Sequence, residues 1–261
     1  MVGNTGGYRH LLTAVVKRNL LMYIRYPINS LGRVVMDIGL FVVLFGGGTL
    51  LAGQAMDDSI EGIVVGYFLW MLTIQSFQGI AEEIQQEANW GTLERHFMTP
   101  FGFPIVMAAK SIAILITTFV FASILLLAMM IITGTWLHLD IITILPIVLL
   151  TLSSAFGVGF AASGLTVLYK NIGSWFGLLN FVFLGLIAAP TLNVPGIAFL
   201  PLVQGSELLQ RAMSNGVRLW EFQLSSLLTL ASVGVGYLLI GYLIFHMCQK
   251  RARKLGTLGD Y

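Results

Sequence analysis

Long apolar segments alternate with short polar connections along most of the chain. A helix needs about 20 mainly apolar residues to cross the hydrocarbon core of a bilayer. Six segments have roughly this length and character, and each predicts a membrane-spanning helix. They are Val34–Leu51, Ile60–Ile80, Pro104–Thr133, Ile141–Leu168, Ile172–Ala189 and Leu224–Met247. The pattern therefore predicts an all-α integral membrane protein in which six transmembrane helices form a single domain, residues 1–261.

The N-terminal segment has a different pattern. Between Tyr8 and Tyr26, most apolar side chains fall on one side of a helical wheel, and basic and polar residues fall mainly on the other. Such a pattern is typical of a helix that lies along the membrane surface. Pro27 ends this helix, because proline cannot continue the hydrogen-bond ladder. We therefore expect residues 1–33 to form an amphipathic connecting helix that leads into the first span.

Two connections are long enough to hold structure of their own. The connection Ala81–Phe103 is rich in acidic residues and is bounded by prolines, which predicts a short helix lying across the cytoplasmic face. A protein partner could bind such a helix. The segment Pro190–Gln223 contains prolines, apolar patches and a helical stretch near Ser206–Met213. Its prolines interrupt it too often for a membrane-spanning helix, and it is too apolar for a loop in water. We therefore expect a re-entrant or interfacial outer element whose backbone is buried in protein.

Composition and charge placement agree with this layout. Hydrophobic residues make up 57% of the chain and charged residues only 10%, against about 25% charged in soluble domains, which excludes a soluble globular protein. Six spans place both termini on one side. Of the 14 Lys and Arg residues, 12 then share that side, and only Arg211 and Arg218 lie opposite. The positive-inside rule therefore predicts that both termini are cytoplasmic.

The sequence offers little for catalysis. No lysine follows a glycine, so the chain lacks a Walker A loop and is not expected to bind ATP in that way. The four histidines are far apart, with no two at metal-ligand spacing, and we expect no metal and no bound cofactor. Ala162-Ser163-Gly164 resembles a fragment of an intramembrane serine protease site, but small residues more often allow helices to approach closely. We expect a non-catalytic chain with no nucleic-acid partner.

The cytoplasmic connection contains the run Glu87-Ala-Asn-Trp-Gly-Thr-Leu-Glu-Arg-His-Phe-Met-Thr-Pro100. This run resembles the cytoplasmic signature of the ABC transporter type-2 permease family, in which an acidic residue is followed by Gly-Thr-Leu-Glu and later by Thr-Pro. The resemblance implies that the run is a coupling helix docked onto a separate ABC ATPase subunit. The candidate coupling residues are Glu87, Gly91, Thr92, Leu93, Glu94, Arg95, Phe97 and Pro100.

The family resemblance also implies an assembly and a function. Two permease copies, taken here as identical, would join two ATPase subunits that bind ATP and Mg²⁺, in the plasma membrane of a prokaryote. The Gly-Thr-Leu-Glu form resembles the branch that exports drugs, antibiotics and lipids, so we expect an amphiphilic or lipid-linked substrate. Polysaccharide exporters usually end this loop in Phe-Pro, and Phe103-Pro104 leaves that alternative open. A self-sufficient secondary transporter would need mid-membrane ion-coupling carboxylates or an inverted repeat, and we find neither.

Polar and aromatic residues on the second and fifth spans are candidates for the substrate pathway, since the family resemblance places these helices around the central cavity. Polar side chains are costly in hydrocarbon unless they face a cavity or form hydrogen bonds between helices. The candidates are Phe68, Gln75, Gln78, Phe176, Asn180 and Phe183. Packing remains the alternative for the polar ones, and lipid contact for the aromatic ones. Arg33 and Asp37, four residues apart, are interpreted as a structural ion pair.

Overall fold

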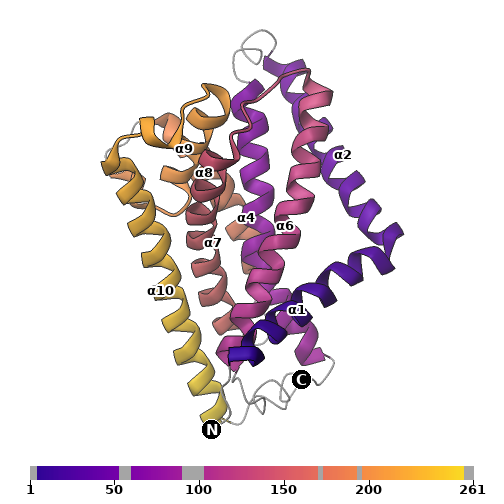
Figure 1. Cartoon of the computed structure of the whole chain (residues 1–261), viewed down its shortest axis with the longest axis vertical. Coiled ribbons are helices and arrows are strands. Elements are labelled where there is room, and N and C mark those ends of the chain that lie inside the picture. The colour runs from indigo at the N-terminus through magenta and orange to yellow at the C-terminus, as the bar shows by residue number, and fades with distance from the viewer. Residues whose placement is uncertain (1–4, 53–59, 90–102, 170–172, 193–195, 256–261) are drawn as a thin grey trace.

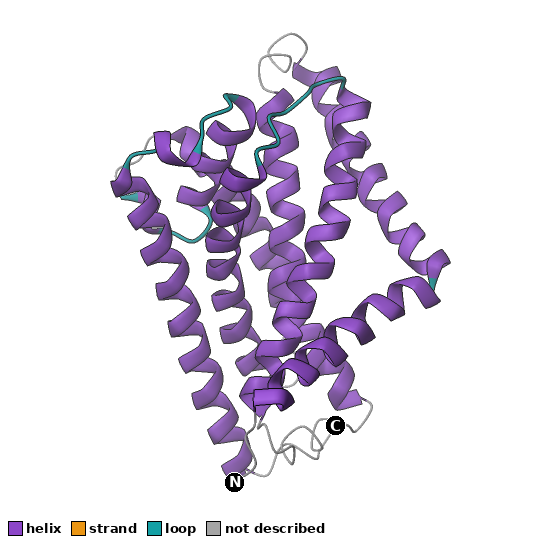
Figure 2. Ribbon diagram, viewed as in Figure 1, coloured by secondary structure: helices purple, strands orange, loops and turns teal. Residues whose placement is uncertain are grey.

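The computed structural model of the chain describes residues 5–52, 60–89, 103–169, 173–192 and 196–255. Within these ranges every regular element is a helix. The α-helices are α1 (Thr5–Arg25), α2 (Pro27–Ala52), α4 (Ile60–Asn89), α6 (Phe103–Thr133), α7 (Ile141–Tyr169), α8 (Gly173–Ala188), α9 (Val203–Ser214) and α10 (Leu224–Leu255). Three short 3-10 turns, η1 (Ala189–Leu192), η2 (Ile197–Phe199) and η3 (Leu219–Glu221), complete the set. Figure 2 shows this all-helical architecture.

Five helices, α2, α4, α6, α7 and α10, are long and apolar enough to cross a membrane. The all-α membrane fold is therefore confirmed at this level. Helix α8 corresponds to the predicted fifth span, Ile172–Ala189, but has only 16 residues. A helix of that length extends about 24 Å, less than the hydrocarbon core of about 30 Å. The six-span topology stays a prediction, because α8 alone is too short for a full crossing.

The N-terminal helix α1 ends at Arg25, so the predicted boundary of the connecting helix at residue 33 is wrong. Residues 27–33 belong to α2, whose apolar stretch begins at Pro27. Helix α1 runs across the lower end of the bundle, and the chain turns at Tyr26 into α2 (Figure 1). Pro27 is the first residue of α2, where its missing N–H leaves no helical bond unmade. Ser30 Oγ donates to the carbonyl of Tyr23 at 3.1 Å, and the Tyr23 ring lies 4.6 Å from that of Phe121 on α6. The start of α1 and the end of α10 lie at the same end of the bundle.

Helix α4 is longer than the sequence pattern predicted. The predicted span ended at Ile80 and the separate polar connection began at Ala81, but α4 continues without interruption to Asn89. The added residues are mostly Ala, Glu and Gln, which favour helix even where they no longer favour hydrocarbon. The predicted boundary at Ala81 is therefore wrong. The rest of that connection, residues 90–102, lies outside the described residues.

The segment Pro190–Gln223 folds back onto the bundle. Its main element, α9, packs against α4 and α7 (Figure 1), and most of its residues are buried, including Leu208, Leu209 and Met213. Ser206 Oγ donates to the carbonyl of Ile187 at 2.7 Å and so ties α9 to the end of α8. The predicted helical stretch is confirmed, and α9 is buried in protein as expected. The described residues on either side of α9, such as Phe199 and Trp220, are exposed. The re-entry of the segment into a membrane stays a prediction.

Helices α7 and α10 share the most extensive helix–helix interface of the described chain. Glycines make this approach possible. A Cβ added at Gly241 of α10 would overlap the carbonyl oxygen of Gly157 on α7, and one added at Gly234 would overlap that of Leu150. A Cβ at Gly164 would lie 2.9 Å from Phe245 Cα. The packing interpretation of the small residues around Gly164 is therefore confirmed.

Candidate functional site

Only one of the predicted coupling residues lies in the described part of the chain. Glu87 belongs to the last turn of α4. The other seven, from Gly91 to Pro100, fall in residues 90–102, outside the described residues. The coupling helix therefore stays a prediction, but the element that leads into it, α4, is now defined.

Four of the six predicted pathway residues meet where α4 packs against α8. Gln78 Nε2 donates to Asn180 Oδ1 at 3.3 Å. The ring of Phe77 on α4 lies 5.3 Å from that of Phe176 and 5.1 Å from that of Phe183. These contacts bring the two predicted helices together within one chain. These contacts agree with a packing role and also with a pathway role for the four residues. The pathway role stays a prediction.

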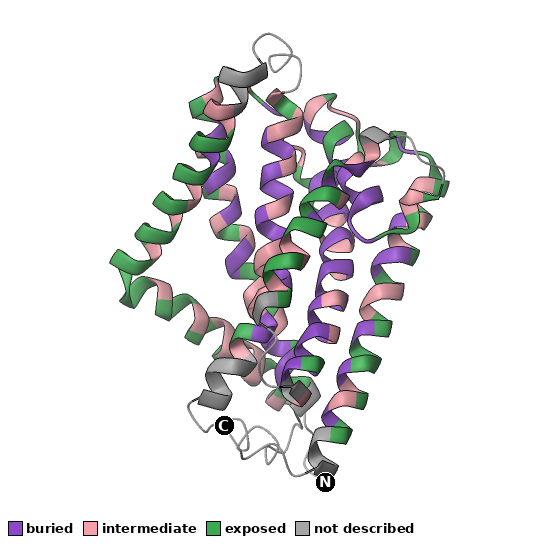
Figure 3. Cartoon of the chain, turned by 180° about the vertical axis from the view of Figure 1, so that it is seen from behind, coloured by how far each residue is buried: buried purple, intermediate pink, exposed green. Residues whose placement is uncertain are grey.

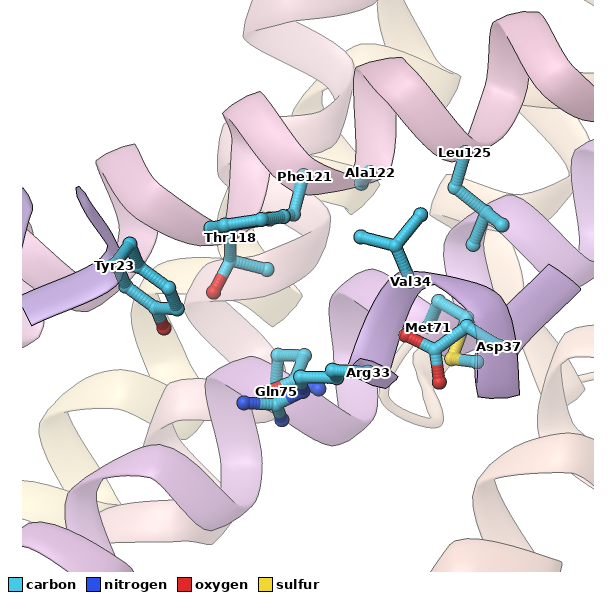
Figure 4. A pocket seen from close by; sticks show the side chains of 10 residues that line it. All are labelled: Tyr23, Arg33, Val34, Asp37, Met71, Gln75, Thr118, Phe121, Ala122 and Leu125. Carbon is cyan, nitrogen blue, oxygen red and sulfur yellow. Dashed lines mark hydrogen bonds between the residues drawn. The ribbon is translucent and has the colours of Figure 1, made fainter. Parts of the chain in front are cut away.

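The other two predicted pathway residues lie elsewhere. Phe68 is buried in the core of the chain, only 2% exposed. Gln75 faces α2, where the guanidinium of Arg33 donates a hydrogen bond to its side-chain oxygen (Figure 4). The sequence paired Arg33 with Asp37, but an ion pair between them is not among those formed by the described residues. Arg33 instead connects two helices, because α4 approaches α2 at this level.

A polar cavity of about 270 Å³ adjoins this contact, enclosed by α1, α2, α4 and α6. Its charged lining residues are Arg18, Arg33, Glu82, Glu83 and Lys110. A smaller pocket of about 30 Å³ continues from it and is mostly apolar, with the carboxylate of Asp37 at its side (Figure 4). Arg33 and Gln75 line both spaces. A charged chamber therefore leads into an apolar recess between the helices.

An ion cluster holds three of these helices together. Lys110 Nζ of α6 lies 3.0 Å from Glu83 Oε1 of α4, and Arg18 of α1 contacts the same oxygen at 3.4 Å. Lys110 is only 4% exposed, and a buried charge is tolerated only when it is paired. The cluster therefore fixes α1 against α4 and α6.

Sequence reasoning missed this cluster. Lys110 counted only as one more basic residue on the inner side, and Glu83 as one of several acids in a loop. The available signal was the position of Lys110, seven residues after the start of a strongly apolar helix. A charged side chain at such a position requires an oppositely charged or hydrogen-bonding partner within the protein. The partner could not be identified, because it is presented by the unexpected extension of α4.

The cavity brings charged and polar side chains of four helices together. Among the described residues, no group of three or more His, Cys, Asp or Glu side chains could hold a metal ion. No protein-family model matches the sequence, and no curated protein matches it. The functional assignment therefore depends on the residues and their arrangement alone.

Proposed function

We propose that the chain is the membrane-spanning subunit of an ATP-driven ABC exporter, working with a separate ATPase subunit on an amphiphilic drug, lipid or lipid-linked substrate. The observation that carries the proposal is the run Glu87–Pro100, with Gly-Thr-Leu-Glu at 91–94 and Thr-Pro at 99–100. This run connects the two long apolar helices α4 and α6. The proposed assembly contains two identical copies of this chain and two ATPase subunits, which bind ATP and Mg²⁺.

The fold supports the proposal in three ways. Helix α1 crosses the end of the bundle from which the run departs (Figure 1). The broken segment from α8 to α9 lies at the opposite end, where a closure of the pathway is required. Helix α2 is almost uncovered within the chain (Figure 3), and α8 exposes Trp175, Phe181 and Leu178. These apolar faces leave room for both lipid and a second copy.

Helix α4 gives the proposal a physical route for coupling. It is continuous over 30 residues, Ile60–Asn89, so it is about 45 Å long. Sharp kinks form mainly where proline or another group interrupts the hydrogen-bond ladder, and α4 contains no proline, so a displacement of one end can be passed along the helix. A displacement of the run Glu87–Pro100 by an ATPase would therefore reach Gln78 and its partner Asn180 on α8.

The test is a charge reversal in the run. Glu94→Lys should abolish substrate-stimulated ATP hydrolysis in a complex reconstituted with the partner ATPase subunit, because it reverses the charge that the ATPase surface is proposed to contact. The matched control is Glu61→Lys, the same reversal at the exposed start of α4. Both variants should insert and purify like the wild type. Equal stimulation in the two variants would reject the proposal.

A further inference from the structure

The corner between α1 and α2 forms an open groove of about 790 Å³. Arg25, Pro27, Asn29, Arg33 and Met36 are among the residues that line it. Its lining contains two arginines and no carboxylate. The groove is therefore cationic at the place where the chain turns from α1 into the first span.

The groove is continuous with the polar cavity, because Asn29 and Arg33 line both. Within the cavity, Glu83 is already paired with Arg18 and Lys110. Asp37 lies deeper, in the small apolar recess. Glu82 also lines the cavity, so acidic groups flank the groove on its inner side. None of them is among the residues that line the groove itself, and the two arginines of the groove remain accessible to a ligand that enters from the membrane surface.

The surface beside the groove is apolar. Ile28 is 86% exposed and Met36 75% exposed, and α2 as a whole is hardly covered by the rest of the chain (Figure 3). Exposed aliphatic side chains on a spanning helix face the lipid chains. The groove thus combines a cationic centre with an apolar wall, which matches an amphiphile that has an anionic headgroup.

We propose that this groove binds one membrane lipid through its phosphate group. Guanidinium groups recognise phosphate with paired, charge-assisted hydrogen bonds. Arg33 donates to Gln75 through one terminal nitrogen, and a guanidinium has five N–H donors, so Arg33 keeps donors for a phosphate. Arg25 supplies the second cation, and the Asn29 amide supplies a neutral donor. The acyl chains lie along the exposed face of α2.

The depth of the groove agrees with a lipid rather than a soluble anion. Arg33 comes six residues after Pro27, the first residue of α2, which places its Cα about 9 Å along the helix. A long basic side chain at that depth extends toward the headgroup region. Anionic lipids concentrate in the cytoplasmic leaflet, and basic groups beside a span attract them. The inference does not depend on the proposed export function.

The experiment measures lipid binding to the purified chain in a zwitterionic detergent. A fluorescent phosphatidylglycerol should bind with at least tenfold higher affinity than the matching phosphatidylcholine, although both carry a phosphate, because choline neutralises the net charge. Arg33→Gln and Arg25→Gln should each weaken phosphatidylglycerol binding about tenfold, equal to about 1.4 kcal/mol. Arg33→Lys should recover part of that loss. Arg211→Gln, at the opposite end of the bundle, is the control and should bind like the wild type.

Three outcomes would overturn the proposal. Equal affinity for the two lipids would remove the anionic specificity. Unchanged binding in both Arg33→Gln and Arg25→Gln would move the site elsewhere. Displacement of the lipid by an equal concentration of free glycerol phosphate would make the ligand a soluble phosphate. Arg25 is exposed, so its variant keeps the test valid even if Arg33→Gln fails to fold.

Discussion

The contact between α7 and α10 makes a prediction whose size follows from the structure. Gly241→Ala adds one methyl group to α10 at the point where it meets α7. That methyl group would overlap the backbone carbonyl oxygen of Gly157. Gly157 has no side chain that could give way, so the overlap must be relieved by moving the two helices. A Cβ at Gly241 would lie 1.8 Å from that oxygen. Carbon and oxygen atoms settle at about 3.3 Å or more, so the two helices must separate by about 1.5 Å.

Two opposing effects set the magnitude. In a helix interior alanine is favoured over glycine by about 1 kcal/mol. Overpacking a close contact costs about 1 to 3 kcal/mol, and the cost at Gly241 should lie at the upper end, because the obstacle is backbone. We therefore expect Gly241→Ala to destabilise the protein by about 2 kcal/mol after the gain in helix propensity is included.

Gly236→Ala is the matched control on the same helix. A Cβ at Gly236 would meet no atom within 4 Å, so this variant should be as stable as the wild type or up to about 1 kcal/mol more stable. The free energy of unfolding is measured by titrating the purified protein from a mild detergent into dodecyl sulfate. Equal stability of the two variants would refute the reasoning that backbone contact holds α7 and α10 together.

Three further predictions concern the polar contacts and the orientation. Glu83→Ala should cost about 3 kcal/mol in the same titration, because it removes a carboxylate partner of a buried lysine; an unchanged midpoint would mean that the cluster adds no stability. Asn180→Ala should cost only about 0.6 kcal/mol, typical of one hydrogen bond between spans, and a cost above 2 kcal/mol would contradict this. In a Cys248→Ser background, an impermeant thiol reagent added to intact cells should label a cysteine at Gln223 but not one at Lys250. The reverse pattern would invert the topology.

The sequence predicted where apolar helices occur more accurately than where they end. The third span was expected at Pro104–Thr133 and α6 is Phe103–Thr133, because Pro104 marks its start and Gly134, which has a positive φ, follows its end. The last span was expected to end at Met247, yet α10 continues to Leu255. Gln, Lys and Arg leave the hydrocarbon but still favour helix. Hydropathy therefore locates the membrane segment and not the end of the helix.

The hydrogen-bond partners of polar side chains were harder to predict from the sequence than the polar side chains themselves. The cost of polar side chains in hydrocarbon identified Gln75, Gln78 and Asn180 one by one, but it could not show that Gln78 pairs with Asn180 while Gln75 turns to Arg33. Helix rotation decides such pairs, and one residue changes it by about 100°. The same limit applies to small residues. An added Cβ would meet nothing within 4 Å at Gly177 but would overlap backbone at Gly241, and the sequence around these glycines does not distinguish the two.

Helix α4 connects the features that the sequence suggested separately. Its hydrogen bond from Gln78 to α8 and its ion cluster at Glu83 lie five residues apart, about 7.5 Å along one rigid helix. If α4 moves while one of these two contacts is kept, the helix on the other side of the second contact must therefore rotate or slide with it. The cluster at Glu83 also holds α1, which ends at the corner that forms the lipid groove. Under the proposed function, a displacement of the run Glu87–Pro100 by the ATPase would be transmitted by α4 both to the pathway at Asn180 and to the groove at Arg33.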